Sequence, residues 1–201
     1  MVIIGITGPT GAGKTTALKE LEKLGGCIID ADAVYHELLA RDIALRKELE
    51  DRFGPLTDEE GNIQRKKLGA IVFSDPAAMA DLNAITHRYI GAAIRVRIDR
   101  AREKGCLAAA IDAIRLFESG LAAECDTTLA ITAPPEVRIR RIMAREGIPE
   151  DYARVRVSAQ PSDDFFTRQC EYVLTNDCAS SEDFGARARK LFVSILSKDI
   201  Q

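Results

Sequence analysis

A glycine-rich segment near the start of the chain constrains the fold more than any other feature. Residues Gly8–Thr15 read GPTGAGKT and match the pattern G-x-x-x-x-G-K-[ST] at every fixed position. The segment follows Val2–Thr7, a short apolar run typical of a buried parallel strand. It precedes a helical pattern in which Leu18, Leu21 and Leu24 share one face. A strand, a phosphate-binding loop and a helix in this order predict an α/β nucleotide-binding fold.

The residue types of this loop are those that bind a nucleoside triphosphate with Mg²⁺. Glycines let the backbone approach phosphate oxygens closely, and the helix N-terminus adds partial positive charge. We expect Lys14 to neutralise the β- and γ-phosphates, Thr15 to ligate Mg²⁺, and Thr16 to donate to an α-phosphate oxygen. The predicted nucleotide-binding residues of the loop are Gly8, Thr10, Gly11, Ala12, Gly13, Lys14, Thr15 and Thr16.

Four later segments predict further strands, which gives a sheet of five. Leu107–Ile111 fits either a helix or a buried strand, and its place between Gly105 and Asp112 favours a strand. Helical patterns separate the strands, so the sheet is expected to be parallel with helices on both faces. The other three strands are Cys27–Ile29, Thr127–Thr132 and Tyr172–Leu174, and the helical patterns include Val34–Phe53, Lys67–Phe73, Pro76–Lys104 and a last helix capped by Ser180 or Ser181.

Composition excludes several classes of protein. Lys and Arg number 28 against 31 Asp and Glu, a net charge of −3, which argues against a strongly basic nucleic-acid binder. No secretory signal is present, and no apolar run reaches the ~18 residues of a membrane span, so we expect a cytoplasmic protein. An odd number of cysteines without a Cys-x-x-Cys pair predicts reduced, partly buried thiols at Cys27, Cys106, Cys125, Cys170 and Cys178.

Carboxylates at strand ends supply candidates for a catalytic base. Asp30 and Asp32 follow the second strand, at the sheet edge where ligands of open parallel sheets bind. Asp32 is either a base for an acceptor hydroxyl or the cap of a helix that starts at Ala33. Asp112 ends an apolar run and either orients Mg²⁺-bound water or caps a turn.

An arginine-rich segment is the candidate for a lid. Six arginines fall within residues 138–156, and Arg138, Arg141 and Arg145 have the spacing of one helix face. That face either points at phosphate or is solvated and paired with acidic neighbours. The acidic neighbours are Glu136, Glu146 and Glu150. A phosphate loop, a base and a lid favour a small-molecule kinase over a GTPase, since no Asn-Lys-x-Asp guanine reader is present.

Several motifs in register resemble the dephospho-CoA kinase family, over about residues 2–195. Ile29–His36 resembles the family's Asp-Ala-Asp segment, Gln64–Phe73 its Arg-x-x-Leu…Val-Phe element, and Leu82–His87 its Leu-Asn-x-x-x-His motif. The residues that follow in the expected order are Leu116-Phe117-Glu118, Arg141, Arg145, Arg156 to Gln160 and Asn176.

The resemblance implies a three-layer P-loop NTPase core, a helical acceptor lobe inserted after the second strand, and a short helical lid. The expected bounds are 1–33, 106–140 and 170–201 for the core, about 34–105 for the lobe and about 141–169 for the lid.

The implied reaction is transfer of the ATP γ-phosphoryl group to the ribose 3′-hydroxyl of dephospho-CoA. Asp32 would be the general base or would orient the hydroxyl, and Lys14, Arg141 and Arg145 would stabilise the transferred charge. Asn176 would bind the nucleotide, and the acceptor would contact Asp32, His36, Arg65, His87 and Asp112. The implied partner is a small molecule, with no nucleic acid or membrane, and the chain would be a monomer or weak homo-oligomer.

Two positions depart from the family pattern near the acceptor site. The Asp-x-Pro-Leu-Leu-Phe-Glu stretch reads DAIRLFE over Asp112–Glu118, which loses the proline and places Arg115 at an apolar position. The family's His-Pro becomes His87-Arg88. The alternatives are a P-loop kinase of another nucleotide or small alcohol, and a non-catalytic nucleotide-responsive protein.

Overall fold

The computed structural model describes residues 1–198 and divides the chain into two compact units. The first unit consists of Met1–Ile29 and the chain from Ile98 onward, and the second unit is Asp30–Arg97. The second unit occupies the place in the chain where the sequence predicts an inserted lobe.

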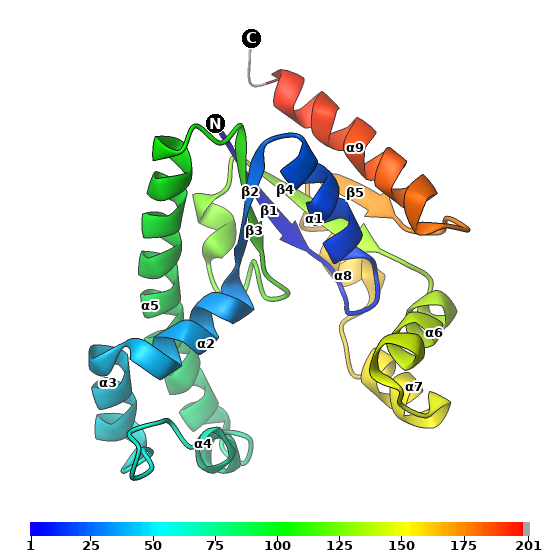
Figure 1. Ribbon diagram of the computed structural model, residues 1–201. Coiled ribbons are helices and arrows are strands. Elements are labelled where there is room, and N and C mark those ends of the chain that lie inside the picture. The colour runs from blue at the N-terminus through cyan, green and yellow to red at the C-terminus, as the bar shows by residue number, and fades with distance from the viewer. Residues whose placement is uncertain (199–201) are drawn as a thin grey trace. The chain divides into compact units, whose positions relative to one another are not determined.

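A five-stranded sheet forms the centre of the first unit and confirms the predicted fold class (Figure 1). The strand order is β2-β3-β1-β4-β5, and β1 pairs in parallel with both β3 and β4. Every residue of β1 is buried, as the apolar run at the start of the chain predicts. The strands are β1 Val2–Thr7, β2 Gly26–Asp30, β3 Ala108–Asp112, β4 Thr127–Thr132 and β5 Tyr172–Thr175.

Different helices cover the two faces of this sheet. Ile4 and Ile6 of β1 join the core cluster that includes residues of α1 (Lys14–Lys23) and α9 (Ser181–Lys198). Side chains alternate along a strand, so Gly5 points to the other face, where a Cβ would meet Leu116 and Cys125 at 2.8 Å. The unit also contains η1 Leu121–Glu124, α6 Pro135–Glu146, α7 Glu150–Ser158 and α8 Asp163–Thr167.

The second unit is helical, as the sequence predicts. Its helices are α2 Ala31–Arg41, α3 Ile43–Phe53, α4 Arg65–Val72 and most of α5 Pro76–Glu103, which continues into the first unit. Buried side chains of these helices and Leu56, between α3 and α4, form one apolar cluster. Its helical members include Leu39, Leu45, Leu49, Leu68 and Val72.

The prediction of one helix over residues 34–53 is wrong at its middle. Asp42 interrupts the pattern, because its extended backbone ends α2 and its side chain accepts a hydrogen bond from the Leu45 N–H at 2.9 Å. An aspartate that caps a new helix favours this geometry over continuation of the preceding one. The apolar residues keep their helical spacing across Asp42, so the spacing alone does not reveal the break between α2 and α3.

The prediction of reduced cysteines is wrong for two of the five. Cys27 in β2 and Cys106 immediately before β3 form a disulfide, with Cα atoms 6.1 Å apart. The two strands are neighbours in the sheet, although the cysteines are 79 residues apart in the sequence. Cys125, Cys170 and Cys178 are free thiols, and burial raises the pKa of Cys125 to about 12.

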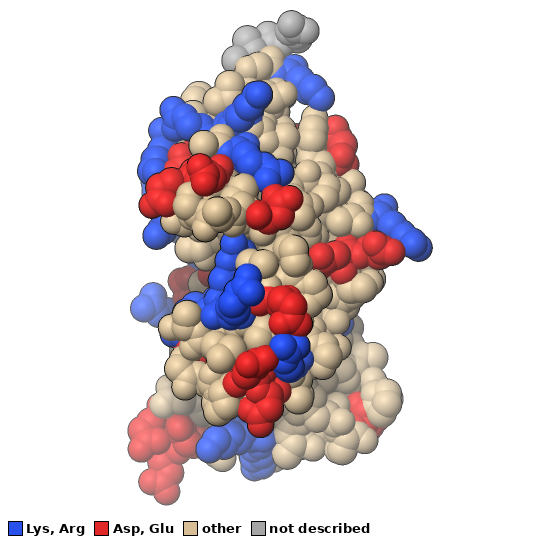
Figure 2. Space-filling view, turned by 90° about the vertical axis from the view of Figure 1, so that its right-hand side faces the viewer, with Lys and Arg blue, Asp and Glu red and all other residues tan. Residues whose placement is uncertain are grey.

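No helix within residues 1–198 is long and apolar enough to cross a membrane. On the face that Figure 2 shows, basic and acidic side chains are intermingled. Surface arginines pair with nearby carboxylates, as Arg187 does with Asp177 and Arg154 does with Glu136 and Glu150.

Candidate active site

The glycine-rich segment forms the loop between β1 and α1, and two of its glycines are required by close contacts. Gly8 has a φ of 140°, and a Cβ there would lie 2.0 Å from the Ile131 carbonyl oxygen. Gly13 caps α1 with a φ of 107°, and a Cβ there would lie 2.3 Å from Asn176 Nδ2. Only glycine fits both the backbone angle and the space at these positions. These are the two fixed glycines of the sequence pattern.

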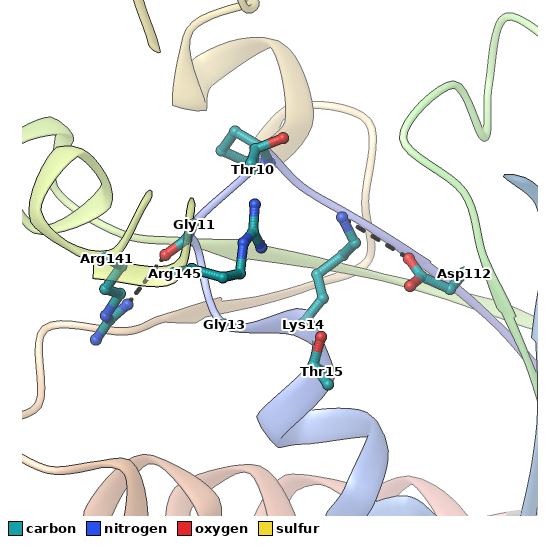
Figure 3. A pocket seen from close by; sticks show the side chains of 9 residues that line it. Thr10, Gly11, Gly13, Lys14, Thr15, Asp112, Arg141 and Arg145 are labelled. Atoms are coloured by element: carbon teal, nitrogen blue, oxygen red, sulfur yellow. Dashed lines mark hydrogen bonds and ion pairs between the residues drawn. The ribbon is translucent and has the colours of Figure 1, made fainter. Parts of the chain in front are cut away.

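A cavity of about 430 Å³ opens beside this loop (Figure 3). Lys14 extends into it, donates to the Gly8 carbonyl oxygen at 3.0 Å and lies 3.8 Å from Asp112 Oδ1. Backbone of the loop and three cationic side chains surround the space, an arrangement that attracts a polyanion. The lining residues are Pro9, Thr10, Gly11, Gly13, Lys14, Thr15, Asp112, Arg141 and Arg145.

Thr15 and Asp112 supply the oxygen atoms of this cavity that suit a magnesium ion. Thr15 is in the first turn of α1, and Asp112 ends β3, paired in register with Ile6 of β1. Mg²⁺ usually takes one or two protein oxygens and completes its shell with substrate phosphates and water. Residues 1–198 contain no cluster of three or more His, Cys, Asp or Glu able to hold a metal alone. The donor set therefore fits an ion that arrives with a triphosphate.

The three arginines predicted to share a helix face have different environments. Arg145 lines the cavity and also pairs with Glu146 at 2.6 Å (Figure 3). Arg141 donates from Nη1 to the carbonyl oxygens of Gly11 at 3.2 Å and Ala12 at 3.4 Å. Arg138 is buried and donates to the Thr10 carbonyl oxygen. Burial lowers the pKa of both Arg138 and Arg141.

The solvated-helix alternative therefore fails for two of these arginines. Glu136 and Glu150 pair instead with Arg154 on α7, at 2.8 and 2.7 Å. The alternative holds in part for Arg145, which contacts both the cavity and Glu146. The arginine-rich segment thus has an inner face on the phosphate loop and an outer face of ion pairs.

Asn176 lies behind the loop, directly after β5, and is 3% exposed. Its Nδ2 donates to the Ala12 carbonyl oxygen at 2.9 Å, and its Oδ1 accepts from Arg141 at 3.0 Å. The Asn176 amide therefore forms hydrogen bonds with the loop through Nδ2 and with Arg141 through Oδ1. Thr16, the remaining residue predicted to bind nucleotide, donates its backbone N–H to the Gly13 carbonyl oxygen at 3.0 Å.

The predicted acceptor residues Asp32, His36, Arg65 and His87 belong to the second unit. Asp30 accepts from the Ala33 N–H at 2.9 Å and caps α2, so the alternative in which Asp32 is the cap is wrong. Asp32 is exposed in the first turn of α2, and His36 follows at the spacing of one helix face.

Arg65 and His87 are on two other helices of this unit. Arg65 is the exposed first residue of α4, and His87 is half-buried on α5. Burial raises the pKa of Tyr35, and the charge of Arg65 opposes that shift. Tyr35 also packs against the apolar cluster of this unit.

The comparisons with known proteins agree on one family. The model of the dephospho-CoA kinase family matches residues 2–182. A curated dephospho-CoA kinase from Dehalococcoides mccartyi is 37% identical over 179 residues, which covers 89% of this chain and 90% of that protein.

Two solved structures are also similar over nearly their whole length. A dephospho-CoA kinase from Campylobacter jejuni is 26% identical with a TM-score of 0.71, and the match covers 98% of each chain. The protein TT1252 from Thermus thermophilus is 29% identical with a TM-score of 0.77, and the match covers 97% of each chain.

Proposed function

The chain belongs to the dephospho-CoA kinase family and phosphorylates dephospho-CoA with ATP, and we propose here which of its residues carry the reaction. One observation supports the proposal most strongly: Lys14, Thr15 and Asp112 line the same cavity as the backbone of a complete phosphate loop. The transfer is direct and in line, without a covalent intermediate on the enzyme.

The nucleotide side of the reaction relies on fixed positive charge. Lys14 contacts the β- and γ-phosphates, and the N–H groups of Gly11 and Gly13 bind further phosphate oxygens. The hydroxyl of Thr16 binds at the α-phosphate, whereas the Thr10 N–H already donates to Gln160. Arg145 and Arg141 both line the cavity, where Arg145 reaches the transferred group and Arg141 adds positive charge. These cations stabilise the negative charge that moves to the leaving ADP, and they are in place before the reaction begins.

We propose that Mg²⁺ binds together with the triphosphate. Bound Mg²⁺ would neutralise charge on the β- and γ-phosphate oxygens and so ease departure of ADP. Thr15 would hold it through Oγ1, and Asp112 would accept a hydrogen bond from water in its shell.

On the acceptor side, Asp32 is the proposed general base. Its carboxylate accepts the proton of the ribose 3′-hydroxyl as that oxygen bonds to the γ-phosphorus and the bond to the β,γ-bridging oxygen breaks. The proton then passes to solvent, and ADP and CoA leave. His36 lies on the same face of α2, and Arg65 and His87 supply donors for the phosphates of the acceptor.

An acceptor panel tests this proposal. Release of ADP is measured with dephospho-CoA, adenosine, a second nucleotide and shikimate, and the product is identified by its 3′-phosphate in a phosphorus NMR spectrum. We expect ADP release to require dephospho-CoA and CoA to form in equal amount. Release stimulated only by another acceptor would refute the assignment of the substrate, and ATP binding without turnover on any acceptor would refute the kinase reaction.

We propose that the chain acts as a monomer or weak homo-oligomer in the cytoplasm, on a small-molecule substrate and without nucleic acid or membrane. The balanced charge of the sequence supports the part of this proposal that excludes nucleic acid. Sedimentation analysis over a range of concentrations tests the oligomeric state.

A further inference from the structure

Thr10, inside the phosphate loop, has all three of its polar groups bound by two distant side chains. Its N–H donates to Gln160 Oε1 at 3.1 Å, and its Oγ1 accepts from Gln160 Nε2 at 2.8 Å. Its carbonyl oxygen accepts from Arg138 Nε at 3.0 Å. Gln160 is 150 residues from Thr10 in the sequence, and Arg138 is 128 residues away. The segment after β4 therefore fixes this part of the loop from outside.

Arg138 and Gln160 are in turn fixed by one another and by Asp163. Arg138 Nη2 donates to Gln160 Oε1 at 2.5 Å, and Arg138 Nη1 lies 3.8 Å from Asp163 Oδ1. The side chain of Arg138 is 3% exposed, and a buried cation needs such a counter-charge to be stable. Burial accordingly lowers the pKa of Arg138 and raises that of Asp163. The pair orients the guanidinium, and the guanidinium orients the amide of Gln160.

The same helix binds the next two carbonyl groups of the loop. Arg141, one turn after Arg138 on α6, donates to the carbonyl oxygen of Gly11 (Figure 3) and to that of Ala12. In a planar trans peptide the C=O group and the following N–H point in opposite directions. The carbonyl oxygens of Thr10 and Ala12 face α6, so the N–H groups of Gly11 and Gly13 face away from it.

Close packing leaves the loop little room to turn these groups around. A Cβ on Gly11 would lie 3.0 Å from the Arg138 carbonyl oxygen and 3.1 Å from its Cα. The backbone of the loop thus rests directly on α6, and rotation of a peptide group would break a hydrogen bond to a guanidinium.

We propose that Arg138 and Gln160 are positioning residues that keep the phosphate loop in its anion-binding conformation before the nucleotide arrives. This inference rests on the proposed binding of ATP at the loop. A loop without these two side chains would have to be ordered by the nucleotide itself, and that ordering would subtract from the binding free energy. The loss should appear in the affinity for ATP and not in the affinity for the acceptor.

The test compares three replacements of Gln160 in the full-length enzyme. Gln160→Met keeps the volume and removes the hydrogen bonds, Gln160→Glu keeps acceptors for Thr10 and Arg138, and Gln160→Ala removes the whole group. Gln169→Ala is the matched control, because Gln169 is an exposed glutamine whose side chain donates to the Phe165 carbonyl oxygen of its own segment. Melting temperature, Kd for ATP, both KM values and kcat are measured for each.

We expect Gln160→Met and Gln160→Ala to raise Kd and KM for ATP about tenfold, with KM for dephospho-CoA within twofold of the original. Gln160→Glu should restore most of the affinity, and Gln169→Ala should leave it unchanged. Arg138→Lys should have an affinity for ATP between those of Gln160→Ala and Gln160→Glu. The ammonium of lysine cannot reproduce the fork geometry with which the guanidinium donates to both Thr10 and Gln160.

Two results would overturn the inference. One is a lower melting temperature in Gln160→Met or Gln160→Ala with unchanged Kd for ATP, which would make the network purely structural. The other is an equal rise in both KM values. If Gln160→Ala does not fold, the Met and Glu variants still decide the matter. ATP binding to the unaltered protein is measured first, and its absence would refute the proposed function, whereas equal binding by protein and variants refutes only this inference.

Discussion

The two units of the protein present their candidate site residues in different ways. In the first unit, Arg138 and Asn176 are buried and hydrogen-bonded to the phosphate loop, and Lys14 is bonded to Gly8. In the second unit, Asp32, His36 and Arg65 are exposed side chains on helices whose apolar faces form a separate core.

This difference matches the two kinds of ligand. A triphosphate carries its charge in a compact shape that varies little, so a rigid binding loop that is formed before binding suits it. The entropy cost of ordering that loop is then part of folding and does not reduce the binding free energy. A long, flexible acceptor needs contacts spread over a surface, and exposed side chains become ordered when it binds. We therefore expect the proposed nucleotide site to be preorganised and the proposed acceptor site to be completed by its substrate.

The largest effect is expected in the rigid unit. Replacing Lys14 by alanine should lower kcat/KM for ATP by about 10³-fold, because the charged donor that we propose for the transferred phosphoryl group is lost from the cavity. Steady-state kinetics at fixed dephospho-CoA measure this. Lys19→Ala, an exposed lysine of the same helix, is the control and should stay near wild type. Similar losses in both variants would contradict a special role for the cavity.

A smaller and more selective effect is expected in the second unit. Arg65→Ala should raise KM for dephospho-CoA about tenfold, the size of one lost charge-assisted hydrogen bond, and leave KM for ATP unchanged. Lys67→Ala removes another exposed cation from the same helix and should change neither value by more than about twofold. A rise in KM for ATP in Arg65→Ala would break the separation of the two substrates.

The smallest effect concerns the outer face of the arginine-rich segment. The hydrogen bond from Arg154 holds the pKa of Glu136 below its ordinary value of 4.5. A carboxylate with a lowered folded-state pKa stabilises the protein above the unfolded value, and this contribution disappears as the pH falls through the folded value. Arg154→Ala should therefore lower the melting temperature slightly at pH 7 and converge with the wild type below about pH 4.5. A difference in melting temperature that widens in acid would contradict this assignment. The kcat of Arg154→Ala should equal that of the wild type.

Much of the fold follows from local signals in the sequence. β1 and β4 span the residues that their apolar runs predict, and Ser180 accepts a hydrogen bond from the Asp183 N–H at the start of the last helix. The break at Asp42 was missed, because capping by one side chain competes with a helical spacing that continues across it. Signals carried by one side chain are weaker than signals carried by a repeating pattern.

The residues of the candidate site also differ in how well the sequence predicts them. Its loop is one contiguous string, so the sequence alone reveals Lys14 and Thr15. The support of the loop comes from residues 128 and 150 positions away, and no spacing rule connects Thr10 with Arg138 or Gln160. The cystine between Cys27 and Cys106 was missed for the same reason, since only strand order brings these residues together.

The most direct test of the whole account is the substitution Asp32→Asn, set against Asp30→Asn. Asparagine caps a helix as well as aspartate does, so Asp30→Asn should keep stability and turnover. Asp32→Asn removes a proton acceptor without changing shape, and it should lower kcat about 10³-fold while Kd for ATP and for dephospho-CoA stays within threefold. Turnover above a tenth of the wild-type value in Asp32→Asn, or an equal loss in Asp30→Asn, would contradict the account.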